Sequence, residues 1–316
     1  MRQLVKILDY FFLLRPIVLI PVWFFYLIGV YHAILLNKGK FDIMFFPNWQ
    51  LIKGFLIVSI VGGTAYIINQ IYDIETDKIN RKLFLLSDGY ISVTSSWIFV
   101  FVLYLLLFFL LYNQNFHVKL FTIALVILSF LYSAYPFHFK GRPFFDLFSN
   151  AFGNGFLNIG IGYCLYSHNI YNLLVISLPY IFMTGVVFLY TTIPDIEGDK
   201  KTGNITTGVY LGVDKTIILG LILLILSITF GIINKDIIAL LPILLSLYFF
   251  IIVFYKKEVH YFLKAVRLCT ASITLIVGIL FPFFILIIIF IVLLSRLYYK
   301  RRFGIIYPKI FTKDRI

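Results

Sequence analysis

The sequence contains the stretch Asn69-Gln70-Ile71-Tyr72-Asp73-Ile74-Glu75-Thr76-Asp77-Lys78. Its acidic pattern is repeated later in the chain as Pro194-Asp195-Ile196-Glu197-Gly198-Asp199-Lys200. Both copies stand where a long apolar run gives way to a polar segment. The chain contains only 14 acidic residues, so two matched pairs of aspartates need an explanation. We expect the four carboxylates to act together at one site.

The composition around these motifs is that of a membrane protein. Of 316 residues, 61% are hydrophobic and only 13% are charged, with a mean hydropathy of +0.99. Soluble proteins contain roughly 25% charged residues. No polar linker separates two folds, so we expect one transmembrane domain over residues 1–316, surrounded by membrane lipid.

Nine segments are long and apolar enough to cross a bilayer, which takes roughly 20 residues as a helix. Backbone groups in lipid must be satisfied within the segment, so the expected fold class is all-α, a polytopic transmembrane helix bundle. Residues 1–23 lack a cleavage site for a signal peptide and are expected to begin the first span. The expected spans are 12–36, 51–72, 95–112, 117–136, 146–166, 172–193, 214–233, 236–255 and 268–295.

The repeat predicts an internal symmetry. Asp73 and Asp195 are 122 residues apart, as are Asp77 and Asp199, and they follow the second and sixth spans. Those spans run in the same direction. We therefore expect two pseudo-repeated four-helix halves, about 10–136 and 146–255, around a central cavity, with the last span at about 268–295.

The net charge of +13 is interpreted through the membrane. Basic loops follow the even-numbered spans. Cytoplasmic loops of membrane proteins are rich in lysine and arginine, so we expect both acidic motifs on the cytoplasmic side. The expected location is the cell (inner) membrane. No basic stretch is interleaved with aromatic residues outside the apolar runs, so nucleic acid is not an expected partner. Nine spans leave the basic C-terminal segment on the other side, against the rule. A break at Pro282 into two short limbs is the alternative, and we prefer nine spans.

The aspartates have the spacing of a metal site. Asn69, Asp73 and Asp77 follow at i, i+4 and i+8, which places them on one face of a helix. Asp195 and Asp199 repeat the spacing. Mg²⁺ prefers oxygen ligands and is commonly held by one or two carboxylates together with substrate phosphates. A single pair at a helix end would usually be a solvated surface, but two copies at equivalent places favour Mg²⁺ bound against a diphosphate.

Other candidate residues surround the two motifs. Lys140 and Arg142 follow the fourth span, and Lys200 follows the second aspartate pair, where each could bind phosphate oxygens or simply anchor a loop. Arg15 either faces the cavity or extends to the interface. We take these four as substrate-binding candidates. Tyr132, at the end of the fourth span, fits an interfacial aromatic residue.

The fifth span carries a run of small and polar residues. Gly153-Asn154-Gly155 is followed by Asn158, Gly160 and Gly162. Small residues let helices approach closely in membranes. Asn154 and Asn158 could face a cavity, but we expect them to form packing hydrogen bonds. Glu75 and Glu197 point away from their flanking aspartates and are expected to face solvent or to pair with nearby lysines.

With these residues described, the chain resembles the UbiA superfamily of intramembrane prenyltransferases. The resemblance rests on Asn69-x-x-x-Asp73-x-x-x-Asp77, on Asp195-x-x-x-Asp199 followed by Lys200, on Leu14-Arg15-Pro16 and on Tyr132-Ser133. The expected order of spans covers nearly the whole chain. One departure is the run Asn80 to Ser87, which lacks the proline that many members have there.

The resemblance implies a cavity that opens to lipid and is capped by the acidic motifs. It implies a polyprenyl diphosphate whose head is bound through Mg²⁺, and transfer of the prenyl group to an acceptor with release of diphosphate. Carried over by position, Asn69, Asp73, Asp77, Asp195 and Asp199 match the metal and diphosphate motifs. Lys140, Arg142 and Lys200 match basic positions near the diphosphate. Tyr132 matches a tyrosine that stabilises the allylic cation or orients the acceptor.

The resemblance, together with the two acidic motifs, therefore favours an integral-membrane prenyltransferase that uses Mg²⁺, with an aromatic or a lipid acceptor. The alternative is a transporter or lipid-binding membrane protein whose acidic pairs are cation sites. Ionisable residues that mark ion paths lie within membrane spans, whereas these aspartates lie at helix ends beside basic residues. The identity of the acceptor and the length of the prenyl chain stay open.

Overall fold

Long apolar helices build the body of the protein in the computed structural model, which describes residues 2–80, 84–201 and 203–308. In these ranges every regular element is helical, and nine helices are long and apolar enough to cross a membrane. The all-α bundle is thus confirmed, and the number of candidate spans equals the predicted nine, although the predicted last span supplies two of them and the predicted fifth span none. The nine are α2 (Ile20–Lys38), α3 (Trp49–Tyr72), α6 (Val93–Tyr112), α7 (Phe116–Ser133), α10 (Ile170–Thr192), α12 (Thr207–Ile233), α13 (Ile237–Lys256), α14 (Val259–Leu280) and α15 (Pro282–Phe303).

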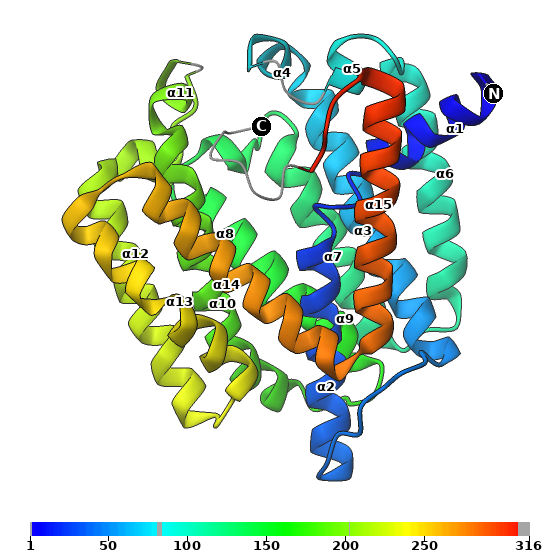
Figure 1. Ribbon diagram of the computed structural model, residues 1–316. Helices are drawn as coiled ribbons and strands as arrows, with labels where there is room; N and C mark the ends of the chain where they lie inside the picture. Colours follow the sequence, from blue (N-terminus) through cyan, green and yellow to red (C-terminus); the bar gives the residue numbers. More distant parts are fainter. Residues whose placement is uncertain (1, 81–83, 202, 309–316) are drawn as a thin grey trace.

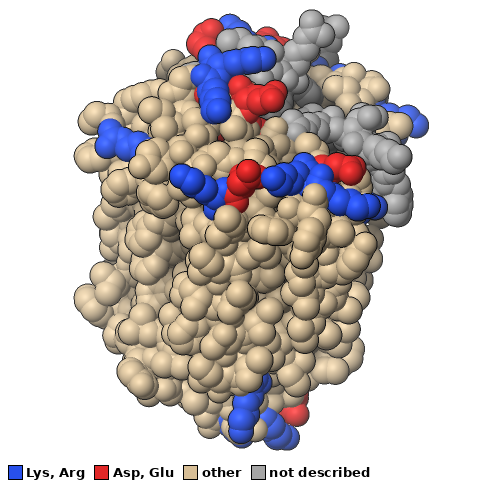
Figure 2. All heavy atoms as spheres, turned by 90° about the vertical axis from the view of Figure 1, so that its left-hand side faces the viewer, with Lys and Arg blue, Asp and Glu red and all other residues tan. Residues whose placement is uncertain are grey.

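Shorter elements cluster at one end of the bundle or interrupt a longer helix (Figure 1). We call this end, which carries both acidic motifs, the motif end. Figure 2 shows charged side chains gathered at the two ends of the molecule, with a wide uncharged band between them. The shorter elements are α1 (Arg2–Leu13), α4 (Ile74–Asn80), α5 (Phe84–Ser87), the 3₁₀ turns η1 (Phe139–Gly141) and η3 (Ile193–Asp195), α8 (Phe145–Phe152), the π-helix η2 (Gly153–Asn158), α9 (Ile159–Cys164) and α11 (Ile196–Lys201).

The first span begins later than predicted. The expected span 12–36 is divided, because α1 ends at Leu13 and α2 begins at Ile20. Between them Arg15 adopts a left-handed backbone conformation with φ of 54°. Pro16 explains the break, since the residue before a proline is disfavoured in the α region.

The predicted last span, 268–295, is wrong, because this stretch forms parts of two helices. The break falls at Phe281, where the backbone leaves the helical region, and Pro282 is the first residue of α15. Leu280 lies at the end opposite the motifs, where its carbonyl accepts a hydrogen bond of 3.0 Å from Met44 N. The other end of α15 returns to α1, where Arg302 Nη2 lies 3.3 Å from Asp9 Oδ2. The end of α15 therefore lies at the motif end, contrary to our nine-span order.

The predicted fifth span, 146–166, is interrupted, since α8, η2 and α9 divide it. Its last part packs against α2 with backbone touching backbone. A Cβ atom placed on Gly162 would lie 2.0 Å from the carbonyl oxygen of Tyr26, and one on Gly29 would lie 2.0 Å from that of Ile159. Only glycine fits at this crossing, which fixes α9 against the centre of the bundle.

Candidate functional site

The first acidic motif lies across a break between two helices. Asn69 is in the last turn of α3, which ends at Tyr72, and α4 begins at Ile74. Asp73 occupies the break with φ of −104° and accepts a hydrogen bond of 2.9 Å from Asn69 Nδ2 on its Oδ2 atom. The helix predicted to run through all three motif residues is therefore interrupted at its middle residue.

This break separates the surroundings of Asp77 from those of Asn69. Asp77 is buried, with 8% of its surface exposed. It lines a hollow between α4, α5 and the end of α15, together with Tyr90 and Arg302. Asn69 instead lines the cavity inside the bundle. The first motif thus has one end in the cavity and the other against the C-terminal helix.

The second motif follows α10 at the same end of the molecule. Asp195 ends η3 and is exposed, and Asp199 lies in α11. The carboxylate of Asp199 accepts a hydrogen bond of 3.3 Å from Thr206 Oγ1. Lys200 is exposed beside it. Glu75 and Glu197 are also exposed, in agreement with the first of the two positions expected for them.

The loop 134–144 joins the two motifs. Lys140 Nζ forms an ion pair with Asp73 Oδ1, and the side chains are only 12% and 23% exposed. On the other side of the loop, His138 Nε2 lies 3.3 Å from Asn204 Oδ1, in the segment after α11. Sequence reasoning selected Lys140 but missed His138 and Asn204, which have no spacing signal.

Two further contacts fix this loop and the helix that follows it. The guanidinium of Arg142 donates a hydrogen bond of 2.6 Å to the carbonyl of Pro136, and its side chain is exposed. Asp146 is fully buried and accepts hydrogen bonds from Thr207, one of them from the backbone N–H at 2.8 Å. Sequence reasoning missed this carboxylate, although an acid inside a predicted span is itself a signal.

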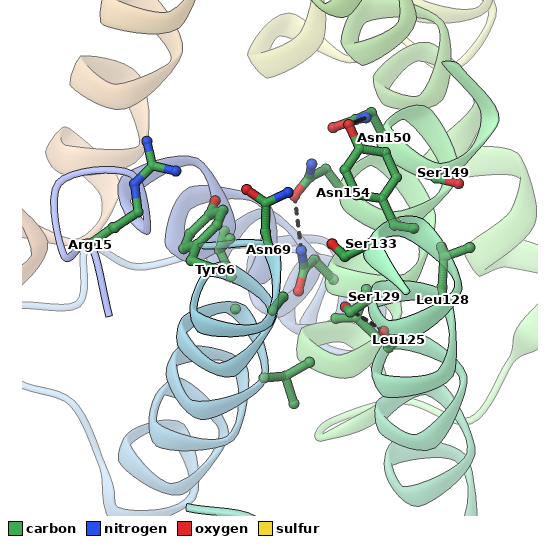
Figure 3. Close-up of a pocket in the computed structure, with 17 residues that line it drawn as sticks. Arg15, Tyr66, Asn69, Leu125, Leu128, Ser129, Ser133, Ser149, Asn150 and Asn154 are labelled. Carbon is green, nitrogen blue, oxygen red and sulfur yellow. Dashed lines mark hydrogen bonds between the residues drawn. The ribbon is translucent and has the colours of Figure 1, made fainter. Parts of the chain in front are cut away.

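A cavity of about 280 Å³ opens between α3, α7 and the α8–η2 segment (Figure 3). Arg15, Asn69 and Tyr132 all line it, so Arg15 faces the cavity, one of the two positions considered for it. Asn150 Nδ2 donates a hydrogen bond of 3.3 Å to Tyr132 OH. The guanidinium of Arg15 lies 5.5 Å from the centre of the Tyr66 ring. The apolar part of the cavity wall is formed by Val22, Val61, Leu125 and Leu128.

The candidate metal ligands fit a hard cation that is shared with a substrate. Within the described residues, no group of three or more His, Cys, Asp or Glu side chains is arranged to hold a metal. The motif side chains nevertheless offer only oxygen ligands, and Mg²⁺ commonly takes one or two carboxylates, several waters and substrate phosphates. Two acidic pairs at one end, joined by a lysine-bearing loop, suit that arrangement better than a closed protein cage.

Fold and site together define a polytopic helical membrane protein with an acidic and basic site at the mouth of an internal cavity. The model of the UbiA prenyltransferase family matches residues 19–267. The chain belongs to this family, which confirms the resemblance derived from the two motifs.

Curated relatives share about half of the chain. A probable homogentisate phytyltransferase 2 of Oryza sativa subsp. japonica is 34% identical over 188 residues, which cover 55% of this chain and 49% of that protein. A digeranylgeranylglyceryl phosphate synthase of Sulfolobus acidocaldarius is 29% identical over 183 residues, 54% of this chain and 60% of the relative. The chain thus spans about half the length of the first of these relatives.

Solved structures share the fold over a longer range. A UbiA homolog from Archaeoglobus fulgidus bound to DMAPP and Mg²⁺ superposes with a TM-score of 0.65 at 20% identity, covering 86% of this chain and 99% of that one. Another structure of a UbiA homolog from that organism gives a TM-score of 0.68 at 22% identity, covering 89% and 99%. At 20–22% sequence identity, this similarity shows that the chain shares the fold of these structures.

Proposed function

We propose that this protein transfers a prenyl group from a polyprenyl diphosphate to an aromatic or lipid acceptor and releases diphosphate. One observation carries the proposal: the ion pair of Lys140 with Asp73 lies beside Asn69, which lines a cavity that is apolar on the side of Val22, Val61, Leu125 and Leu128. A prenyl diphosphate needs both parts, since its head is anionic and its tail is hydrocarbon.

The reaction places distinct demands on the two parts. The allylic C–O bond breaks, diphosphate leaves with the electron pair, the acceptor attacks the allylic carbon, and the acceptor gives up a proton. Bound Mg²⁺ would supply Lewis-acid stabilisation of the leaving diphosphate, with Asn69, Asp73, Asp77, Asp195 and Asp199 as the candidate ligands. Lys140, whose side chain is 12% exposed, can donate to phosphate oxygens. Arg142 and Lys200 stay candidates for the outer part of the diphosphate.

Inside the cavity, Tyr132 is the candidate for contact with the developing cation. Its ring lies on the α7 wall, and its hydroxyl accepts a hydrogen bond from Asn150. An aromatic face attracts a cation. The apolar wall limits water near the cation, which would otherwise be captured as an alcohol.

The acceptor is proposed as a class. The plant relatives are named for homogentisate and for acylphloroglucinols, and the archaeal relatives for digeranylgeranylglyceryl phosphate. We further propose that the motif end faces the cytoplasm in the cell membrane, because Lys78, Lys140, Lys200 and Lys201 gather there and cytoplasmic ends are rich in lysine and arginine.

The test is release of diphosphate by the purified protein in lipid nanodiscs. A labelled prenyl diphosphate series is supplied with Mg²⁺ and with either homogentisate or a glyceryl lipid alcohol, and the lipid products are identified by mass spectrometry. We expect a prenylated product and equimolar diphosphate, loss of both on chelation, and recovery when Mg²⁺ is added back. Cation movement across proteoliposomes without any product would overturn the proposal and favour a transporter.

A further inference from the structure

Two asparagine side chains form a polar pair inside the cavity. Asn158 Nδ2 donates a hydrogen bond of 3.1 Å to Asn154 Oδ1, and both residues line the cavity (Figure 3). Asn158 is only 2% exposed. Its own carbonyl oxygen, Oδ1, is buried and accepts no hydrogen bond from any described residue. A buried acceptor left without a donor is rare in native structures and calls for an explanation.

The backbone builds this pair through a π-helix. In a regular α-helix each step of four residues turns about 40° past a full turn, so Asn158 would point about 80° away from Asn150. The π-helix η2, Gly153–Asn158, takes up extra residues in its turn. As a result Asn150, Asn154 and Asn158 all line the same cavity. Single π-turns of this kind are frequently found at functional sites.

Close packing holds η2 in this shape. A Cβ atom on Gly155 would lie 2.6 Å from the Cα atom of Ile181 in α10, so the two backbones touch. Beyond η2, Gly162 fixes α9 against α2 in the same way. The π-helix is thus packed against α10, and the helix that follows it is packed against α2. The direction of the Cα–Cβ bond of Asn158 is therefore set by the packed backbone.

The position of the pair identifies what could bind it. Asn158 lies eight residues beyond Asn150, roughly 10 Å deeper along the helix, and so is distant from the acidic mouth. A prenyl diphosphate carries no N–H or O–H group along its hydrocarbon tail, so it cannot satisfy a carbonyl oxygen at this depth. The second substrate of the proposed reaction can, if it carries a hydroxyl group.

We propose that the Asn154–Asn158 pair recognises the prenyl acceptor, with Asn158 Oδ1 accepting a hydrogen bond from an acceptor hydroxyl. This inference rests on the proposed function and specifies the acceptor as a hydroxyl donor. The hydroxyl can belong to a polyhydroxylated aromatic ring or to a glyceryl lipid, since both offer the same O–H donor. Asn158 is then a specificity-determining residue that binds substrate away from the reacting carbon.

The experiment compares wild type with Asn158→Leu, which keeps the approximate volume and removes the acceptor atom. The probes are homogentisate, a glyceryl lipid alcohol and the O-methyl ether of each, tested as substrates or as competitive inhibitors. In wild type, methylation of the recognised hydroxyl should weaken binding about 10- to 100-fold, because a buried polar group is left unpaired. Asn158→Leu should weaken binding of the hydroxylated probe by a similar factor and remove the discrimination. The KM for the prenyl diphosphate should change less than twofold.

The matched control is Gln114→Leu. Gln114 is also buried and also has a polar atom, Nε2, with no partner among the described residues, but it does not line the cavity. We expect this variant to discriminate between the probes as wild type does. Asn158→Ala repeats the comparison if the leucine variant does not fold.

Separate outcomes test the two proposals. Wild type that forms no prenylated product with any probe overturns the proposed function. Wild type that forms product, with an Asn158→Leu variant that still discriminates against the methyl ether, overturns only the role of Asn158. That second result would assign the pair to helix packing or to an ordered water.

Discussion

Asp73 is the residue at which the candidate ligands meet. One carboxylate oxygen accepts from Asn69, and the other contacts Lys140. Its place at the end of α3 puts this carboxylate between the cavity and the second motif. These two contacts hold the carboxylate in one orientation, which suits the proposed metal site.

We expect Asp73→Asn and Asp195→Asn each to lower diphosphate release about a hundredfold or more, because each removes a negative oxygen ligand from the proposed metal site. Asp42→Asn is the control, since Asp42 is exposed at the opposite end and pairs only loosely with Lys40 at 3.5 Å. Initial rates at saturating Mg²⁺ and retained elution as a folded protein are the measurements. A rate of diphosphate release equal to that of wild type in either motif variant would contradict the assignment of that aspartate as a Mg²⁺ ligand.

Substitution of Lys140 should strengthen the binding of Mg²⁺ and weaken the binding of prenyl diphosphate. In the structure the Lys140 ammonium group forms an ion pair with the Asp73 carboxylate, a proposed ligand of Mg²⁺. Lys140→Met should therefore tighten Mg²⁺ binding in the absence of prenyl diphosphate, because the competing cation is gone. The same variant should raise the KM for prenyl diphosphate about tenfold or more, because a phosphate donor is lost.

Calorimetric Mg²⁺ titration and steady-state kinetics measure these two effects separately. Lys201→Met provides the control, because Lys201 is exposed. Weaker Mg²⁺ binding in Lys140→Met would show that the lysine supports the metal site and does not compete with it.

At the scale of elements, the crossing of α2 and α9 brings the backbones of the two helices into direct contact. We expect Gly162→Ala to destabilise the protein by about 3 kcal/mol, because the added methyl group overlaps the Tyr26 carbonyl. The thermal midpoint in detergent should fall by about 5–10 °C. Gly198→Ala is the matched control, since a Cβ atom there meets nothing within 4 Å. Equal midpoints for the two variants would mean that the crossing is looser than described.

The same elements show what could be predicted from the sequence. Asn69, Asp73, Asp195 and Asp199 were found because residue type and spacing repeat, and the apolar runs gave the spans. The interruption at Asp73 and the π-helix were not found. They depend on contacts with distant helices, such as Gly155 against α10, which no local pattern carries.

Asn154 and Asn158 show what could not be predicted from the sequence about a single site. Their spacing was compatible with packing and with a cavity, and we expected packing. The structure gives them a mutual hydrogen bond and also a place on the cavity wall. Helical periodicity could not decide between these outcomes, because the π-helix changes which residues share a face.

For the whole molecule, the course of α15 determines on which side the C-terminal helix ends. Asp9 in α1 contacts both Tyr298 and Arg302, and Phe12 stacks on Tyr298 with ring centres 3.9 Å apart. These contacts join the two ends of the described chain beside the first motif. The basic residues Lys300 and Arg301 therefore lie at the end that also carries Lys140, which removes the conflict with the positive-inside rule.

This arrangement predicts the side from which single cysteines are labelled. Lys300→Cys and Lys201→Cys should react with a membrane-impermeant maleimide from the same side, and Lys40→Cys from the other, because α15 returns to the motif end. The native Cys164 and Cys269 are buried and should stay unlabelled. In intact cells the proposed orientation further predicts labelling of Lys40→Cys alone, with the other two reacting only after permeabilisation. If Lys300→Cys reacted together with Lys40→Cys, α15 would not return across the membrane. If all three kept their grouping but with the sides exchanged, the fold would stand and the cytoplasmic orientation would fall.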